Sequence, residues 1–245
     1  MKPAILRVAV LSLMSWSFVS LSWAGDTETQ RVENAATVLN EIMKTPDKGI
    51  PDKVMKSALC VGVIPSMKKG GFVFGAEYGK GVASCHNANG WSAPAPITIG
   101  GGTWGLQIGG EAVDVVFLVM NNKGMEQLLS SKFTLGGDAS VAAGPVGRQA
   151  EGATDWKFKS EVLTYSRTRG IFAGLTLNGA VIAQDHDATK AFYGSDTNFR
   201  SILTGHKTPP AGSAPFLTAL RQFPAQAQTA QAKDNNEPHV QPVQH

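Results

Sequence analysis

Apolar residues repeat with a helical period near the start of the chain. Over residues 27–44 they fall at i, i+3, i+4, i+7, i+10 and i+11, the spacing of one helix face. These positions are Val32, Ala35, Ala36, Leu39, Ile42 and Met43. Pro51 suits the first turn of a second, short helix over residues 51–59. The sequence therefore predicts two helices before any strand.

From about residue 61 to residue 182 the pattern changes to short β-rich runs separated by glycine. Most of the 27 Gly of the chain lie in this region. Glycine inside strands permits bulges, sharp curvature and close backbone approach, which a strongly curled or closed sheet needs. The runs that we expect to form strands are 72–78, 81–85, 97–108, 112–120, 133–143, 158–166, 171–177 and 180–183.

Helical patterns return around and after this region. We expect one inserted helix over 123–131 and short helices over 187–192, 198–203 and 215–221. Several strands carry apolar residues on both faces, so one face is expected in a core and the other under helices or lipid. The predicted fold class is α+β: a Gly-rich, strongly curved antiparallel sheet or partly closed barrel, with N-terminal helices and short C-terminal helices packed on it.

The two ends of the chain differ from this folded region. Residues 1–24 resemble a secretory signal, with Lys2 and Arg7 before an apolar run and small residues at the expected cleavage point after Ala24. The run is shorter than the ~20 residues of a membrane-spanning helix, which disfavours an uncleaved anchor. Residues 224–245 are rich in Ala, Gln and Pro and are expected to be disordered. A single domain is predicted over 25–223, exported to the periplasm.

Composition and charge narrow the class of protein. The chain has 245 residues, 42% of them hydrophobic and 17% charged, which suits a folded core. The formal net charge is +3, and it falls to +1 when Lys2 and Arg7 leave with the signal. This near-neutral balance disfavours a nucleic-acid-binding protein.

Two cysteines, Cys60 and Cys85, remain in the exported chain. In an oxidising compartment an even pair is most simply a disulfide. Closing the loop between them would stabilise the fold by ~3 to 4 kcal/mol in the chain-entropy model. Two unpaired thiols, or a nucleophilic Cys85 beside His86, are the alternatives.

No motif for catalysis, metal or nucleotide binding emerges. Residues 100–105 fit the spacing G-x-G-x-x-G, but a strand follows where a dinucleotide site needs a helix. Asp185 and Asp187 lack the rest of a calcium loop, and a helix cap by Asp185 or Asp187 is the better interpretation. The sequence predicts no cofactor, no metal and no catalytic residue.

The basic residues are more informative. Clustered cations near exposed apolar groups bind anionic lipid headgroups, although most surface lysines are simply solvated. Lys68 and Lys69 are expected in a loop after Pro65, and Arg167 and Arg169 in a tight turn. The complete candidate set is Lys44, Lys48, Lys53, Lys56, Lys68, Lys69, Arg167 and Arg169.

Several long blocks of the sequence resemble the SYLF domain family, in order and over about residues 35–205. They are GGFVFG at 70–75, YGKG at 78–81, GGTWGLQIGG at 101–110, DVV at 114–116, KFTLGGDASVAAGPVGR at 132–148, LTYSRTRGIFAG at 163–174 and FYG at 192–194. The resemblance implies a lipid-binding module without catalytic residues. Eukaryotic relatives bind phosphoinositides through an N-terminal amphipathic helix and basic residues, and some fungal relatives bind actin.

Neither ligand transfers directly to an exported bacterial protein. A periplasm contains no actin, and the first helix mixes Arg31 and Lys44 with Glu33 and Glu41. We therefore expect a non-enzymatic, peripheral protein of the cell envelope. The two N-terminal helices would present Lys53 and Lys56 to anionic phospholipid, with Lys68 and Lys69 nearby. The alternatives are a structural or stress-related envelope protein that binds another protein, and a carrier that encloses a whole lipid.

Overall fold

The computed structural model describes residues 23–44, 49–71, 74–104, 109–146, 160–168, 171–174 and 177–223. The expected tail and nearly all of the expected signal segment therefore lie outside the described residues. The helices are α1 (Trp23–Met43), α2 (Asp52–Ser57), α3 (Asn122–Leu129), α6 (His186–Tyr193), α7 (Phe199–Leu203) and α8 (Ala214–Arg221), with a 3₁₀ turn η1 (Ala211–Ser213) before α8. Among the described residues, no helix has both the length and the apolar character needed to cross a membrane.

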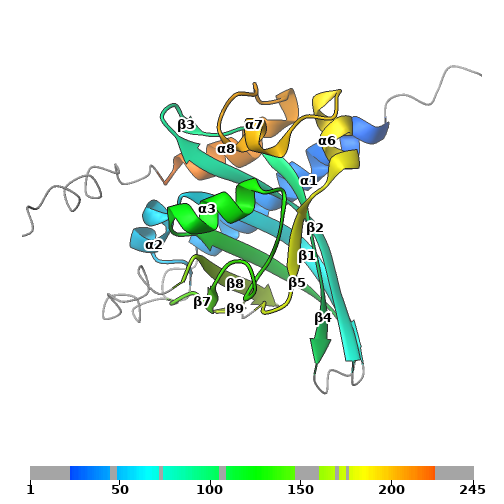
Figure 1. Cartoon of the computed structure of the whole chain (residues 1–245), viewed down its shortest axis with the longest axis vertical. Coiled ribbons are helices and arrows are strands. Elements are labelled where there is room, and N and C mark those ends of the chain that lie inside the picture. The colour runs from blue at the N-terminus through cyan, green and yellow to red at the C-terminus, as the bar shows by residue number, and fades with distance from the viewer. Residues whose placement is uncertain are drawn as a thin grey trace, which may run out of the picture.

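The strands of the described residues form one ten-stranded, strongly curled sheet (Figure 1). Its main path runs β6-β10-β4-β2-β1-β5-β8-β7, with β3 paired to β2 and β9 to β8. All pairs are antiparallel except β7 with β8. The bounds are β1 (Cys60–Gly71), β2 (Phe74–Asn87), β3 (Gly90–Trp91), β4 (Ala95–Trp104), β5 (Gly109–Val119), β6 (Lys132–Thr134), β7 (Val141–Ala143), β8 (Val162–Thr168), β9 (Ile171–Gly174) and β10 (Val181–Gln184).

The predicted class, an α+β fold with a curled sheet and helices packed on it, is confirmed. The prediction missed β1, the strand at the centre of the sheet, because Pro65 suggested a loop. The structure instead accommodates Pro65 and Ser66 in an irregular segment where the register of β1 shifts against both neighbours. Ser66 takes a positive φ of 50° there, and its N–H donates to the Asp114 carboxylate on β5. A bulge therefore lets the strand continue past a residue that cannot donate a ladder hydrogen bond.

Two other strand predictions were wrong in their limits. Residues 74–78 of the first run and 81–85 belong to the single strand β2, since glycine between them does not interrupt pairing with β4. Residues 72 and 73 lie outside the described residues. Residues 133–143 divide into β6 and β7, which lie at opposite edges of the sheet. A turn with Gly136 at a φ of 79° separates them, a conformation that glycine adopts without strain.

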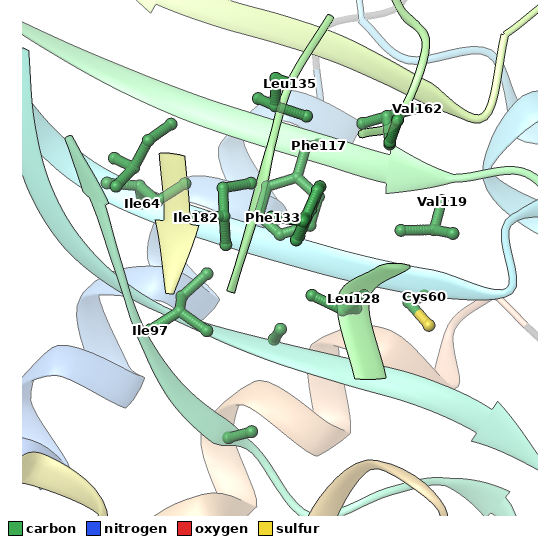
Figure 2. Close-up of a cluster of buried hydrophobic side chains, with 14 of the residues drawn as sticks. Cys60, Ile64, Ile97, Phe117, Val119, Leu128, Phe133, Leu135, Val162 and Ile182 are labelled. Carbon is green, nitrogen blue, oxygen red and sulfur yellow. The ribbon is translucent and has the colours of Figure 1, made fainter. Parts of the chain in front are cut away.

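The inner face of the curled sheet encloses one of two buried apolar clusters. Side chains from the central strands meet those of β6, β10 and α3 inside the curl (Figure 2). Phe117 on β5 lies directly over Gly62 on β1, where an added Cβ would approach the ring to 2.0 Å. Close packing inside the curl thus depends on a glycine in the central strand.

The outer face of the sheet carries the second buried cluster. The apolar side of α1, including Val32, Leu39 and Ile42, packs with α2 and α8 against outward side chains of β1, β2, β5 and β8. All six apolar positions that define the helical period are buried or half-buried here. The apolar face of α1 is therefore used within the fold.

The four central strands continue beyond both clusters. We call this part the strand extension: residues 68–71, 74–78, 100–104 and 109–112 of β1, β2, β4 and β5. Figure 1 shows it projecting away from the helices, at the end of β4 that is remote from α2 and α3. Consecutive pairings such as Tyr78↔Gly100 and Lys68↔Tyr78 hold the strands together. Helices thus cover the body of the sheet on both faces but not its far end.

Candidate functional site

The lysines of α2 are exposed to solvent. Pro51 precedes the helix as its N-cap residue, and Val54 and Met55 anchor it in the outer cluster. Lys53 and Lys56 follow the spacing i, i+3 and so project from neighbouring positions on the helix. Lys53 is exposed and Lys56 half-buried, and neither forms an ion pair with a described carboxylate. Both charges are available to an external anion.

Lys44 adds a third cation to this end of the molecule. It directly follows α1, is exposed, and has no ion pair among the described residues. Lys48, in the link between α1 and α2, lies outside the described residues. We call Lys44, Lys53 and Lys56 the α2 lysines.

Lys68 and Lys69 lie in strand β1, not in the predicted loop. Their side chains therefore project to opposite faces of the sheet. Lys68 is exposed on the outer face. Lys69 Nζ lies 3.4 Å from Glu77 Oε2 on β2, and these side chains are 13% and 4% exposed. The positive charge of Lys69 is thus paired with Glu77 within the fold, while Lys68 remains accessible to solvent.

Arg167 lies in strand β8 and not in a turn, because pairing with β9 continues to Thr168↔Ile171. Its Nη2 lies 2.6 Å from Asp114 Oδ2, and its Nη1 also contacts the Glu41 carboxylate on α1. Burial lowers the pKa of Arg167 and raises that of Asp114. Arg167 therefore joins α1 to the sheet. Arg169 lies outside the described residues.

The candidate cations do not form one site. α2 leads into the start of β1 at Cys60, whereas Lys68 lies toward its other end. A strand rises about 3.3 Å per residue, so Lys68 lies roughly 25 Å from Cys60. The expectation that Lys68 and Lys69 lie near Lys53 and Lys56 was wrong, since an intact strand separates the two pairs where a loop was predicted.

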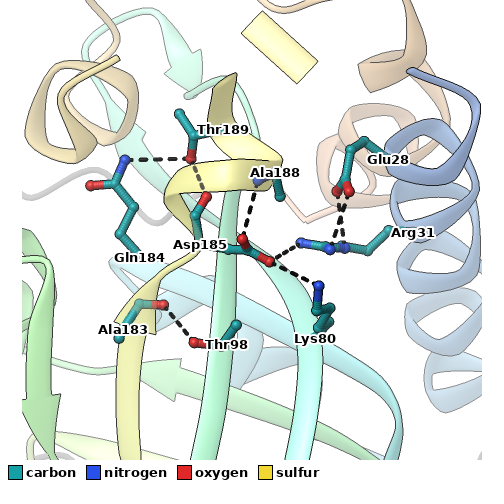
Figure 3. Close-up of polar contacts among 9 residues, drawn as sticks. All are labelled: Glu28, Arg31, Lys80, Thr98, Ala183, Gln184, Asp185, Ala188 and Thr189. Atoms are coloured by element: carbon teal, nitrogen blue, oxygen red, sulfur yellow. Dashed lines mark hydrogen bonds and ion pairs between the residues drawn. The ribbon is translucent and has the colours of Figure 1, made fainter. Parts of the chain in front are cut away.

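A polar cluster that sequence reasoning missed, buried except for Lys80, fixes the start of α1 (Figure 3). Arg31 Nη1 lies 3.0 Å from Asp185 Oδ2, and Arg31 Nε lies 3.1 Å from Glu28 Oε2. Lys80 on β2 also approaches Asp185, at 3.7 Å. Burial raises the pKa of Glu28. We call Glu28, Arg31, Lys80 and Asp185 the Arg31 cluster.

Asp185 was expected to cap a helix, and it does: its Oδ1 accepts the N–H of Ala188 at the start of α6. No local signal links it to Arg31, because the two residues are 154 positions apart. The Arg31 cluster therefore joins α1, β2 and α6, and it has a structural role.

The remaining chemistry of the described residues is sparse. No group of three or more His, Cys, Asp or Glu among them is placed to hold a metal ion. Cys60 and Cys85 face each other across β1 and β2 and are joined by a disulfide. A pocket of about 440 Å³ opens between α3, β10, α6 and α7, with a largely polar lining that includes Gln184, His186 and Arg200. His186 there contacts Asp196 at 3.3 Å.

Comparison with known proteins places these features in a family. Residues 100–223 match the family model of Ysc84, described as a Las17-binding protein actin regulator. The chain belongs to the Ysc84 (SYLF) family. The matched region starts in β4 and includes every later described strand and helix. The resemblance to the SYLF domain seen in the sequence is thereby confirmed.

Curated relatives come from fungi and mammals. An SH3 domain-containing protein of Schizosaccharomyces pombe is 36% identical over 176 residues, which are 70% of this chain and 40% of the relative. Protein YSC84 of Saccharomyces cerevisiae is 34% identical over 197 residues, 77% of this chain and 42% of the relative. The human SH3 domain-containing YSC84-like protein 1 is 33% identical over 198 residues, 78% of this chain and 58% of the relative.

The chain spans between 40 and 60% of the length of the curated relatives it matches. A further relative, from Saccharomyces cerevisiae, is named LAS seventeen-binding protein 3. The names of these relatives refer to SH3 domains and to binding of LAS seventeen, and they name no enzymatic activity. Family membership thus assigns the chain to a group of proteins named for binding.

Proposed function

We propose that this chain is a non-enzymatic, peripheral protein of a bacterial cell envelope that binds anionic phospholipid. The α2 lysines would contact the headgroup phosphates. The observation that carries the proposal is their availability: Lys44 and Lys53 are exposed, Lys56 is half-buried, and no described carboxylate pairs with any of them. Each such cation contributes about 1 kcal/mol near an anionic membrane surface.

Surface docking suits this fold better than enclosure of a lipid. The inside of the curl is filled by its own side chains, including Phe117, Phe133 and Leu135 (Figure 2). The pocket beside α7 has a largely polar lining, which does not match an acyl chain. The apolar side of α1 is buried against the sheet, so this helix is not free to insert into a bilayer without leaving the fold.

The disulfide Cys60–Cys85 supports an exported location, because disulfides persist in oxidising compartments. Together with the signal-like residues 1–24, this favours the periplasm. We do not propose actin as a partner, because a periplasm contains none, although the description of the family names an actin regulator.

The test is co-sedimentation of the mature chain with vesicles of phosphatidylcholine, with and without phosphatidylglycerol. We expect binding only to the anionic vesicles, and a loss of about tenfold or more for Lys53→Glu combined with Lys56→Glu. The matched control is Lys132→Glu combined with Lys190→Glu, which makes the same charge change at exposed lysines on β6 and α6. Equal effects of the two double variants would show that only net charge matters.

A protein partner is the second candidate, favoured by the description of the family as Las17-binding. It becomes the better account if the mature chain binds neither type of vesicle. Under that result, the α2 lysines would be candidates for contact with an acidic protein surface.

A further inference from the structure

We propose that the outer face of the strand extension is the part of the protein that enters the headgroup layer of an anionic membrane, with Tyr78 as the aromatic anchor and Lys68 as the phosphate contact. This inference rests on the proposed function and adds a second contact, far from the α2 lysines. It concerns a surface of the sheet, not the N-terminal helix.

Tyr78 has an unusual position for its size. Among the described residues it is the one large hydrophobic side chain that is exposed, with 52% of its surface accessible. It lies on β2 directly opposite Lys68 on β1, and directly opposed side chains have Cβ atoms about 4.5 to 5.5 Å apart. A tyrosine beside a lysine suits a membrane interface, where the ring lies at headgroup level and the ammonium group meets phosphate.

The surface around this pair is almost bare. The neighbouring outward positions whose side chains the structure describes are Gly100 and Gly102 on β4, Ala76 on β2, Gly70 on β1 and Ala112 on β5. A Cβ added at Gly70 would meet nothing within 4 Å. Because these neighbours carry at most a methyl group, Tyr78 and Lys68 protrude from this part of the outer face and are available to a membrane surface.

Charge is distributed unequally between the two faces of the extension. Its inner face holds the buried Glu77, paired with Lys69. No described residue at an outward position of the extension is acidic, and Lys68 forms no ion pair with a described carboxylate. The outer face is therefore cationic and aromatic, which complements an anionic phospholipid surface. If this face paired with a second copy of the chain, the two faces would carry charge of the same sign.

The test places an environment-sensitive fluorophore on this face. The variant Ala76→Cys, labelled with nitrobenzoxadiazole under non-reducing conditions that preserve the buried Cys60–Cys85 disulfide, is mixed with phosphatidylglycerol vesicles. We expect a blue-shifted and stronger emission on binding. The control is Glu126→Cys, labelled in the same way at an exposed position on α3, for which we expect no shift.

Binding constants provide the second measurement. We expect Tyr78→Ser to weaken vesicle binding about fivefold and Lys68→Glu about tenfold. The variant Lys207→Glu makes the same charge change at another exposed position and should leave binding nearly unchanged. Far-UV circular dichroism checks that each variant is folded.

The outcomes separate this inference from the proposed function. If the vesicles bind and Lys53→Glu with Lys56→Glu weakens binding, but the label at position 76 stays in water, the inference is overturned and the proposed function stands. If no vesicle binding occurs, both fail. If the label at position 76 responds equally without vesicles as the protein concentration rises, the face pairs with a second copy and the inference is also overturned.

Discussion

The same four strands have different surroundings at their two ends. In the body of the sheet, β1, β2 and β5 carry apolar side chains on both faces and β4 carries them on its inner face, and helices or curled strands bury them. In the strand extension, the outward positions with described side chains are mainly Gly and Ala, and they are exposed or half-buried. Backbone pairing continues through both parts without a break in β2 and β4.

This difference separates stability from contact with partners. Burial of apolar area is the main stabilising contribution, so the body should determine the free energy of unfolding. The extension buries little on its outer face, so substitutions there should change binding more than stability. Each of the following measurements tests this division.

The largest effect is expected at Phe117, which is fully buried over Gly62 in the body. Phe117→Ala should lower the free energy of unfolding by about 3 to 5 kcal/mol, because it leaves a cavity inside the curl. Urea denaturation followed by circular dichroism measures the loss. A change below about 1 kcal/mol would contradict the assignment of stability to the body.

The disulfide in the body should contribute nearly as much. Cys60→Ala combined with Cys85→Ala is expected to cost about 2 to 4 kcal/mol, since the unfolded chain gains freedom. Adding a reductant should lower the melting temperature of the wild-type chain and leave that of the double variant unchanged. An equal response of both proteins would show that the bond is not formed in solution.

The Arg31 cluster tests how α1 is held on the body. Arg31→Met removes the main partner of Asp185 and Glu28, whose side chains are 9% and 10% exposed. We expect the free energy of unfolding to fall by about 2 kcal/mol, because two buried carboxylates lose the positive charge that pairs with them. Arg200→Met, which removes an ion pair with both side chains at least half exposed, should cost under about 1 kcal/mol. Urea denaturation compares the two.

Two neighbouring glycines of β4 sharpen the comparison between the faces of the extension. A Cβ at Gly101 would lie 3.1 Å from the Ala180 backbone, whereas at Gly102 the nearest atom, Gly75 O, is 4.0 Å away. Gly101→Ala should therefore cost about 1 kcal/mol, and Gly102→Ala should be neutral or slightly stabilising. Thermal unfolding of both variants checks this, and equal losses would contradict an open outer face.

The smallest effect concerns pH at the body end of β2. Burial lowers the pKa of His86 below its ordinary value of 6.5, so the unfolded chain binds a proton more readily than the folded one. Stability should therefore fall as the pH decreases from about 7 to about 5. His86→Gln should make this dependence shallower in urea denaturation at several pH values. An unchanged slope would show that His86 does not contribute.

Local patterns in the sequence predicted much of the fold. The period of α1, the Asp185 cap of α6 and the β-rich, Gly-rich centre depend on neighbouring residues, and each was recognised. Strand β1 was not, because Pro65 gives a local signal for a loop that the bulge beside Asp114 overrides. The sequence analysis also missed that residues 133–143 divide between two edges of the sheet, because strand pairing depends on distant residues.

For the candidate site, too, some features followed from the sequence and others only from the tertiary structure. The sequence by itself determined the family, the class of fold and the set of candidate basic residues. Only the tertiary structure decided which cations stay available: Lys69 meets Glu77, Arg167 meets Asp114 and Glu41, and the α2 lysines and Lys68 meet no described carboxylate. The physical reason is that periodicity and capping act over a few residues, whereas an ion pair depends on which strands and helices the whole chain brings together.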